Sequence, residues 1–168
     1  LHALATLLAW DGGELRSLIA EPLERMAEAL AHLCHPDGNI ALLNDSALGA
    51  QPEPTALQGF VARIMQRPVQ LPSRGAFALS QTGYFGARED SGHYLVCEAA
   101  PIGPDYQPGH GHADLFSFEL SLAGARAIVD AGVFGYEADE RRAFCRSTRA
   151  HNTVEVAGED QCELWAAF

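Results

Sequence analysis

The stretch GHGHADLFSFEL, residues 109–120, decides how this chain is interpreted. It places His110 and His112 two residues apart, directly before a run in which apolar residues alternate with other types. Residues two apart in an extended strand point to the same face of a sheet. We therefore predict a strand over residues 115–122 and expect both imidazoles to face one site at its beginning.

Two later segments add candidate residues. The segment IVDAG, residues 128–132, places Asp130 at the end of a predicted strand, and RSTRAHNTV, residues 146–154, places His151 among basic and polar residues. Imidazoles and a carboxylate that converge from separate strands suit a metal ion or acid–base chemistry. The spacing alone leaves a second interpretation open, which is a hydrogen-bonded His–Asp pair that joins neighbouring strands.

Composition and charge narrow the class of protein. The 168 residues carry a formal net charge of −11, which argues against nucleic-acid binding. With 48% hydrophobic and 20% charged residues the chain is globular. No segment reaches the ~20 apolar residues that span a bilayer. Because the chain begins at Leu1 without a methionine and ends after an apolar run, we expect it to be a fragment.

The basic residues suggest an anionic ligand. All 11 of them are arginines, and several lie close in sequence to the histidines and Asp130. A guanidinium matches a carboxylate or sulfate with two parallel hydrogen bonds. Arg146 and Arg149 are therefore candidates for binding an acidic sugar, and a surface role is the alternative. The four cysteines contain no CxxC pair, so a thiolate zinc site is not expected.

The chain is organised as helices followed by strands. Apolar residues recur with a helical period over residues 14–33, where Pro22 predicts a kink or a helix start near Glu21. Residues 1–9 predict the end of an earlier helix, and Thr55 the N-cap of a helix that ends near Met65. Predicted strands with tight turns then indicate an antiparallel sheet, one layer of a sandwich. They cover residues 83–88, 93–98, 115–122, 125–130 and 153–156.

The motifs GHGHADxFSFEL, VDAG, RSTxAHNTV and DQxExW, in this order, resemble the heparinase II/III-like polysaccharide lyases. That family includes heparin and heparan sulfate lyases and exo-acting oligoalginate lyases. The resemblance runs from about residue 37 to residue 168. It implies an α+β multidomain fragment, with the last helices of an (α/α) toroid in residues 1–70 and the beginning of an antiparallel β-sandwich in residues 71–168. The active site would lie in the cleft between them.

The resemblance also implies a reaction and its residues. Such lyases remove the proton α to a uronate carboxylate and expel the 4-O-glycosidic oxygen, so they need a cation or donors at the carboxylate, a base and an acid. By this resemblance His110 would lie next to the substrate. It would suit a catalytic role there, because an imidazole titrates near neutral pH. A structural zinc would be held by His112, Asp130 and His151.

Further expectations come from the resemblance alone. The general base, a tyrosine, would lie on toroid helices that precede Leu1, so the fragment is not expected to act by itself. The substrate would be an acidic polysaccharide or oligosaccharide, and the location periplasmic or otherwise extracytoplasmic. The alternative function is a non-catalytic, metal-stabilised β-sandwich that binds a glycan.

Overall fold

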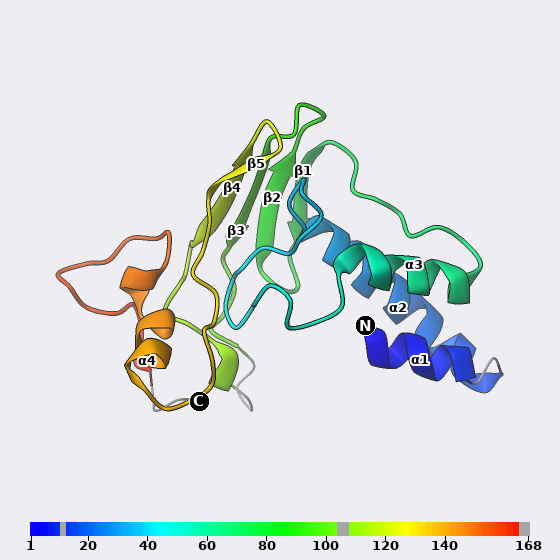
Figure 1. Cartoon of the computed structure of the whole chain (residues 1–168), viewed down its shortest axis with the longest axis horizontal. Helices are drawn as coiled ribbons and strands as arrows, with labels where there is room; N and C mark the ends of the chain where they lie inside the picture. Colours follow the sequence, from blue (N-terminus) through cyan, green and yellow to red (C-terminus); the bar gives the residue numbers. More distant parts are fainter. Residues whose placement is uncertain (11–12, 104–107, 165–168) are drawn as a thin grey trace.

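The computed structural model describes residues 1–10, 13–103 and 108–164. Three helices lie to one side of a central sheet, and a fourth helix lies near the other end of the molecule (Figure 1). The helices are α1 (His2–Trp10), α2 (Glu14–His32), α3 (Pro54–Met65) and α4 (Glu140–Arg146). None of the helices in the described ranges is long and apolar enough to cross a membrane. Trp165, in the last motif of the family resemblance, lies outside the described residues.

The first three helices pack around a small apolar core, listed here by its buried members: Ala5, Leu8, Leu23, Ala27, Val61 and Met65. Helix α2 runs through Pro22, so the predicted helix start near Glu21 is wrong. Proline deprives the carbonyl four residues earlier of its helical partner. That carbonyl belongs to Leu18, which is exposed, so water can reach it.

The beginning of α3 also differs from the prediction. Its first helical residue is Pro54, and Glu53 occupies the N-cap position without a side-chain hydrogen bond. Thr55 therefore lies inside the helix and is not its cap. Proline is favoured at the first helical position because its missing N–H would have no partner there.

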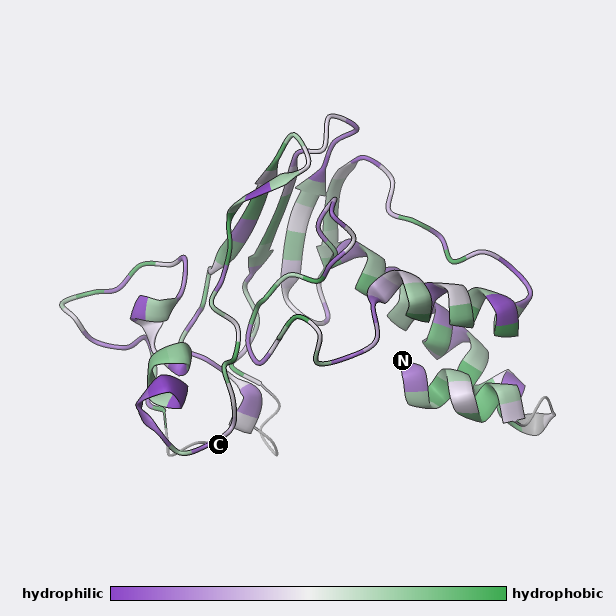
Figure 2. Cartoon of the chain, viewed as in Figure 1, coloured by the Kyte–Doolittle hydropathy of each residue, from purple (hydrophilic) through white to green (hydrophobic). Residues whose placement is uncertain are grey.

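The sheet is an antiparallel meander of five strands in the order β1-β2-β3-β4-β5. The strands are β1 (Gly75–Leu79), β2 (Tyr84–Arg88), β3 (Tyr94–Glu98), β4 (Phe118–Leu122) and β5 (Ala125–Ile128). Apolar residues occupy much of the strands, whereas α4 carries mainly hydrophilic ones (Figure 2). Helices followed by an antiparallel sheet confirm the predicted fold class.

Two predicted strands are corrected. Strand β4 begins at Phe118, three residues later than expected, because Phe116 adopts a positive φ of 65° that breaks the extended run. His110 and His112 therefore do not share the face of a strand: His110 ends the 3-10 helix η1 (Pro108–His110), and His112 lies in the irregular segment that follows. The predicted strand over residues 153–156 is absent and only one bridge, from Val156 to Glu159, is found there.

The buried face of β4 is polar, which the alternating sequence did not predict. Glu119 and Ser121 are fully buried, whereas Phe116 and Leu122 of the same run are 62% and 49% exposed. Strand alternation would place these apolar residues in the core, but they lie outside it. The polar face is satisfied because residues 35–42, which follow α2, supply partners for it.

One buried network fastens the helical part to the sheet. His35 Nε2 lies 2.6 Å from Glu119 Oε2, and His35 Nδ1 lies 2.7 Å from Ser121 Oγ. Glu119 Oε1 accepts hydrogen bonds from the backbone N–H of Leu42 at 2.6 Å and of Asp130 at 3.1 Å. A single carboxylate thus holds the segment after α2 and the end of the last strand together.

Removal of the imidazole should weaken this junction. In His35→Ala the buried carboxylate of Glu119 loses a hydrogen-bond partner, and leaving a buried polar group unpaired typically costs about 1–3 kcal/mol of unfolding free energy or more. Urea unfolding of the full-length protein, followed by far-ultraviolet circular dichroism, measures the loss. Arg74→Ala, which breaks the exposed pair of Arg74 with Asp90, is the control and should cost about 0–1 kcal/mol. Equal stability of the two variants would contradict the assignment.

Candidate functional site

Side chains from α4 and from the turn after it hold residues 109–113, which we call the histidine segment. Hydrogen bonds connect Arg142 Nη2 to the Gly109 carbonyl at 3.1 Å, and Arg146 Nε to the Gly111 carbonyl at 3.1 Å. Thr148 Oγ1 donates to the Ala113 carbonyl at 2.8 Å. The backbone that carries His110 and His112 is therefore fixed by three side chains from outside it.

Helix α4 presents these arginines because its first turn is capped. Asp139 accepts hydrogen bonds from the backbone N–H groups of Arg141 and Arg142, both at 3.0 Å. Such a cap satisfies N–H groups that have no partner within the helix. Arg142 and Arg146, one helical turn apart, both lie buried against the histidine segment.

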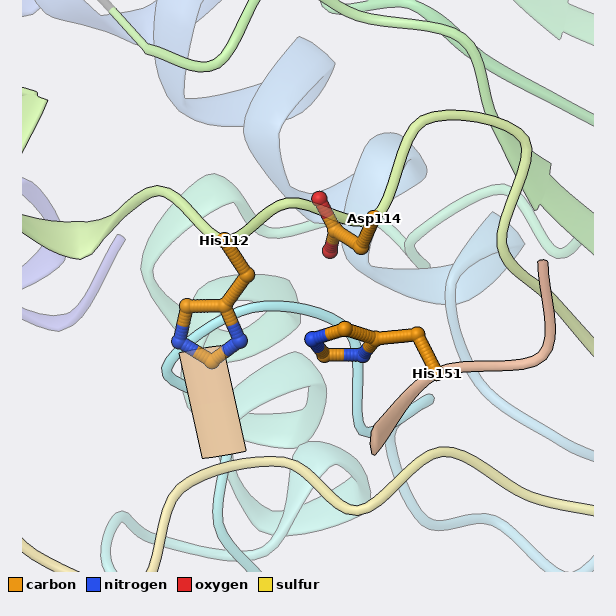
Figure 3. A group of neighbouring side chains, drawn as sticks. All are labelled: His112, Asp114 and His151. Atoms are coloured by element: carbon orange, nitrogen blue, oxygen red, sulfur yellow. The ribbon is translucent and has the colours of Figure 1, made fainter. Parts of the chain in front are cut away.

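A buried cluster of His112, Asp114 and His151 has the composition of a metal site (Figure 3). One ligand atom from each residue lies within 4.8 Å of those from the other two. Within the described part of the chain, His112 Nδ1, Asp114 Oδ2 and His151 Nε2 have no hydrogen-bond partner. Three unpartnered buried polar atoms in one place are costly unless a ligand binds them.

The second nitrogen of each imidazole is bound to a carboxylate. His112 Nε2 lies 2.9 Å from Asp45 Oδ1, and His151 Nδ1 lies 2.9 and 3.0 Å from the two oxygens of Asp130. Carboxylates in this position orient metal-binding histidines and select which nitrogen is free. Two imidazole nitrogens and a carboxylate oxygen are ligands that zinc accepts, so the residues fit such an ion.

Burial and neighbouring charges shift the pKa of each group in the cluster. Burial lowers the pKa of His112 to about 4, so this ring is neutral at pH 7, as a metal ligand must be. Burial also opposes the charged form of His151, but the hydrogen bond and the charge of Asp130 outweigh it and raise the pKa of His151, with a smaller share from the Cys145 carbonyl. Burial raises the pKa of Asp114.

Of the three residues predicted as zinc ligands, His112 and His151 lie in the buried cluster and Asp130 lies behind His151. His112 and His151 come together, with ring centroids 5.2 Å apart. Asp130 lies at the opposite nitrogen of His151 and also accepts hydrogen bonds from Ser117 Oγ at 2.9 Å and Gly132 N at 3.1 Å. Asp114 has the carboxylate near the free nitrogens. The two-residue spacing of His110 and His112 continues to Asp114, and that signal could have found it.

His110 is the exposed member of the motif, with a side chain that is 63% accessible. Its Nδ1 lies 2.8 Å from Asp45 Oδ2, and its ring makes an edge contact with Tyr136 at 6.1 Å between centroids. It borders a cavity of about 370 Å³ that Asn44, Tyr84 and Glu98 also line. The predicted catalytic residue therefore lies at an open cavity that also holds polar side chains.

The two arginines predicted to bind substrate do not line this cavity in the part of the chain that the structure describes. Arg146 is buried beneath the histidine segment. Arg149 is exposed, with its guanidinium over the ring of Phe144 at 5.7 Å. Their contact with substrate stays a prediction.

The sequence analysis did not identify Asp45 or Glu98 as residues of the site. Asp45 lies in the loop between α2 and α3, far in sequence from the histidines that it binds, and no motif marks it. Burial opposes ionisation of Asp45, but hydrogen bonds from Arg142, His110 and His112 outweigh it and lower its pKa. Glu98 accepts a hydrogen bond from Asn44 Nδ2 at 2.7 Å. Burial and the nearby charge of Asp114 raise the pKa of Glu98 to about 7.

Comparisons with known proteins agree on one family. The sequence model described as "Heparinase II/III-like, C-terminal" matches residues 71–168. The heparan sulfate lyase HepC from Pedobacter heparinus is 26% identical, with a TM-score of 0.63, over 79% of this chain and 23% of its own. A structure of heparinase III shares the fold at 18% identity and a TM-score of 0.67, over 88% of this chain and 27% of its own.

The chain thus spans about a quarter of the length of these solved structures. A search of curated proteins found no match.

The raised pKa of Glu98 predicts a pH-dependent stability. Its carboxyl binds a proton in the folded state that the unfolded state has lost, so the unfolding free energy falls as pH rises from 4.5 to about 7. Glu98→Gln should remove this contribution of about 3 kcal/mol. Urea unfolding across this pH range, with chelator present, measures it. Glu89→Gln, in an exposed turn, controls for the change in net charge. Parallel curves for wild type and Glu98→Gln would refute the prediction.

Proposed function

This chain belongs to the heparinase II/III-like family, and from that membership we propose that the whole protein is a polysaccharide lyase that cleaves an acidic, uronate-containing glycan by β-elimination. The observation that carries the proposal is the exposed imidazole of His110 at an open cavity, close in sequence to the buried cluster of His112, Asp114 and His151.

The reaction needs three events at neighbouring atoms. A base removes the proton α to the uronate carboxylate, the electron pair forms a carbon–carbon double bond, and the glycosidic oxygen leaves with a proton from an acid. Negative charge grows on the uronate carboxylate, where donors or cations stabilise it. His110 can take up a proton at Nε2 and, once protonated there, donate to that carboxylate, because Asp45 occupies only Nδ1.

The remaining parts of the machinery are assigned by the family resemblance. The general base would lie on toroid helices outside these residues, so we do not expect this segment alone to turn over substrate. Arg149 has an exposed guanidinium that suits an acidic sugar. Arg146, being buried, would serve binding only through the histidine segment that it holds. A periplasmic or extracytoplasmic location is part of the same proposal.

We also propose a zinc ion in the buried cluster, held by His112, His151 and one carboxylate. The unpartnered oxygen of Asp114 supports Asp114 as the third ligand, whereas the family resemblance supports Asp130 in that place. A bound zinc ion would supply a cross-link between the histidine segment and the turn that follows α4, together with positive charge in the buried cluster. With Asp114 as the ligand, Asp130 orients His151 through its other nitrogen.

The first test is catalytic. The full-length protein is incubated with heparan sulfate, alginate or a bacterial exopolysaccharide, and ultraviolet absorption of the unsaturated uronyl product is followed. We expect activity on at least one glycan and a loss of about 10²–10⁴-fold in His110→Ala, the range for a proton-transfer residue. His93→Ala, a histidine outside the site, is the control. Unchanged activity in His110→Ala would exclude the catalytic role assigned to His110. Absence of wild-type activity on every glycan would favour a non-catalytic, glycan-binding module.

The second test concerns the metal. Elemental analysis of the purified full-length protein should find zinc, and removal by a chelator should lower the Tm because the buried cluster loses its cross-link. His112→Ala and His151→Ala should abolish binding. If Asp114 is the ligand, Asp130→Asn should weaken zinc affinity by about 10–100-fold and Asp114→Asn by more. The reverse order would assign the third ligand to Asp130, and wild-type protein without zinc would contradict the metal proposal.

A further inference from the structure

Asp45 binds three side chains of the site at once. Its side chain is 7% exposed and lies between His110, His112 and Arg142. Oδ2 is 2.8 Å from His110 Nδ1, and Oδ1 is 2.9 Å from His112 Nε2. The guanidinium of Arg142 contacts both oxygens, with Nη2 3.1 Å from Oδ2. A carboxylate paired with an arginine in this way only accepts hydrogen bonds.

This geometry determines which nitrogen each histidine presents. Since Asp45 accepts, His110 must donate from Nδ1 and His112 must donate from Nε2. In the neutral form of each ring, the lone pair then lies on the opposite nitrogen. For His110 this is Nε2, which makes no hydrogen bond to the described part of the chain, on a ring that is 63% exposed. For His112 it is Nδ1, which points into the buried cluster.

We propose that Asp45 is a positioning residue that assigns the two histidines of the motif to different tasks, His110 to the substrate and His112 to the metal. The proposal rests on the proposed function. One carboxylate selects opposite nitrogens of two rings, so two neighbouring residues of the same type face different sites. Asp45 itself touches neither the reacting atoms nor the ion.

The loop that carries Asp45 is fixed on both sides. The Ser46 carbonyl accepts a hydrogen bond from Val133 N at 3.1 Å, and Asn44 donates to Glu98. At Gly132, with a φ of +60°, an added Cβ would lie 2.3 Å from the Ser46 oxygen, so a glycine is needed for this approach. Arg142 also binds the Gly109 carbonyl, so one guanidinium fixes both the carboxylate and the histidine segment.

Asp45→Asn tests this role with little change of shape. An amide has one acceptor oxygen and two N–H donors. It can accept from one imidazole only, and its NH₂ group then faces the N–H of the other ring. The second ring must rotate or move its proton to the opposite nitrogen. At His112 that proton would sit on Nδ1, where the metal would bind. Asp37→Asn is the matched control, because Asp37 also pairs with an arginine, Arg126, outside the site.

Three measurements on the full-length protein separate the outcomes. Zinc affinity, by competition with a chromogenic chelator, should fall about 10–100-fold in Asp45→Asn. At saturating zinc, its kcat should still fall more than its KM rises, since His110 is no longer held. Long-range ¹H–¹⁵N spectra of zinc-free, histidine-labelled wild type should show protons on Nδ1 of His110 and Nε2 of His112, with His110→Ala identifying the first signal.

Each outcome decides the proposal. Wild-type zinc affinity in Asp45→Asn, wild-type kcat at saturating zinc, or the opposite tautomer at either ring overturns it, whereas Asp37→Asn should match wild type. If Asp45→Asn does not fold, the wild-type spectra alone decide. If wild type shows no lyase activity, the proposed function fails, while the zinc affinity and the tautomers still support or overturn the role of Asp45.

Discussion

The carboxylate of Glu119 is the contact on which the arrangement of this molecule depends. It joins the segment after α2, through His35 and the backbone N–H of Leu42, to the backbone N–H of Asp130 just after β5. Because the contacts of Glu119 with His35 and Asp130 are buried, losing either one leaves a polar group without water or partner. The segment that carries Asp45 and the strand end that carries Asp130 are therefore placed by the same side chain.

Contacts between a buried carboxylate and an imidazole recur from this junction to the candidate site. Glu119 binds His35, Asp45 binds His110 and His112, and Asp130 binds His151. Taking such groups out of water is costly, and the cost is offset only when their hydrogen bonds are complete. At His112 and His151 one nitrogen of each ring lacks a partner among the described residues, so the otherwise complete network leaves its gaps at the cluster with Asp114.

Residues of the site come from both inside and outside the segment that the family model matches. The matched segment, residues 71–168, contains His110, His112, Asp114, Asp130 and His151, yet Asp45 comes from the loop before it. An exposed imidazole two residues from a buried ligand-type cluster suits the two needs of the proposed lyase: a group that exchanges protons at the substrate, and a rigid support for it. Rigidity comes from α4, whose arginines bind the backbone of the histidine segment.

Periodicity and motif order determined the local features of this protein: helices before strands, the hairpin of β2 and β3, and the histidine motif itself. These features arise from neighbouring residues, so a sequence can specify them. Only the tertiary structure decided that Glu119 faces inward, that Asp130 lies behind His151, and that Asp45 and Asp114 complete the site. Those contacts depend on how segments far apart in the chain pack together. In addition, the left-handed backbone conformation of Phe116 redirects the following side chains, which an alternating sequence pattern cannot show.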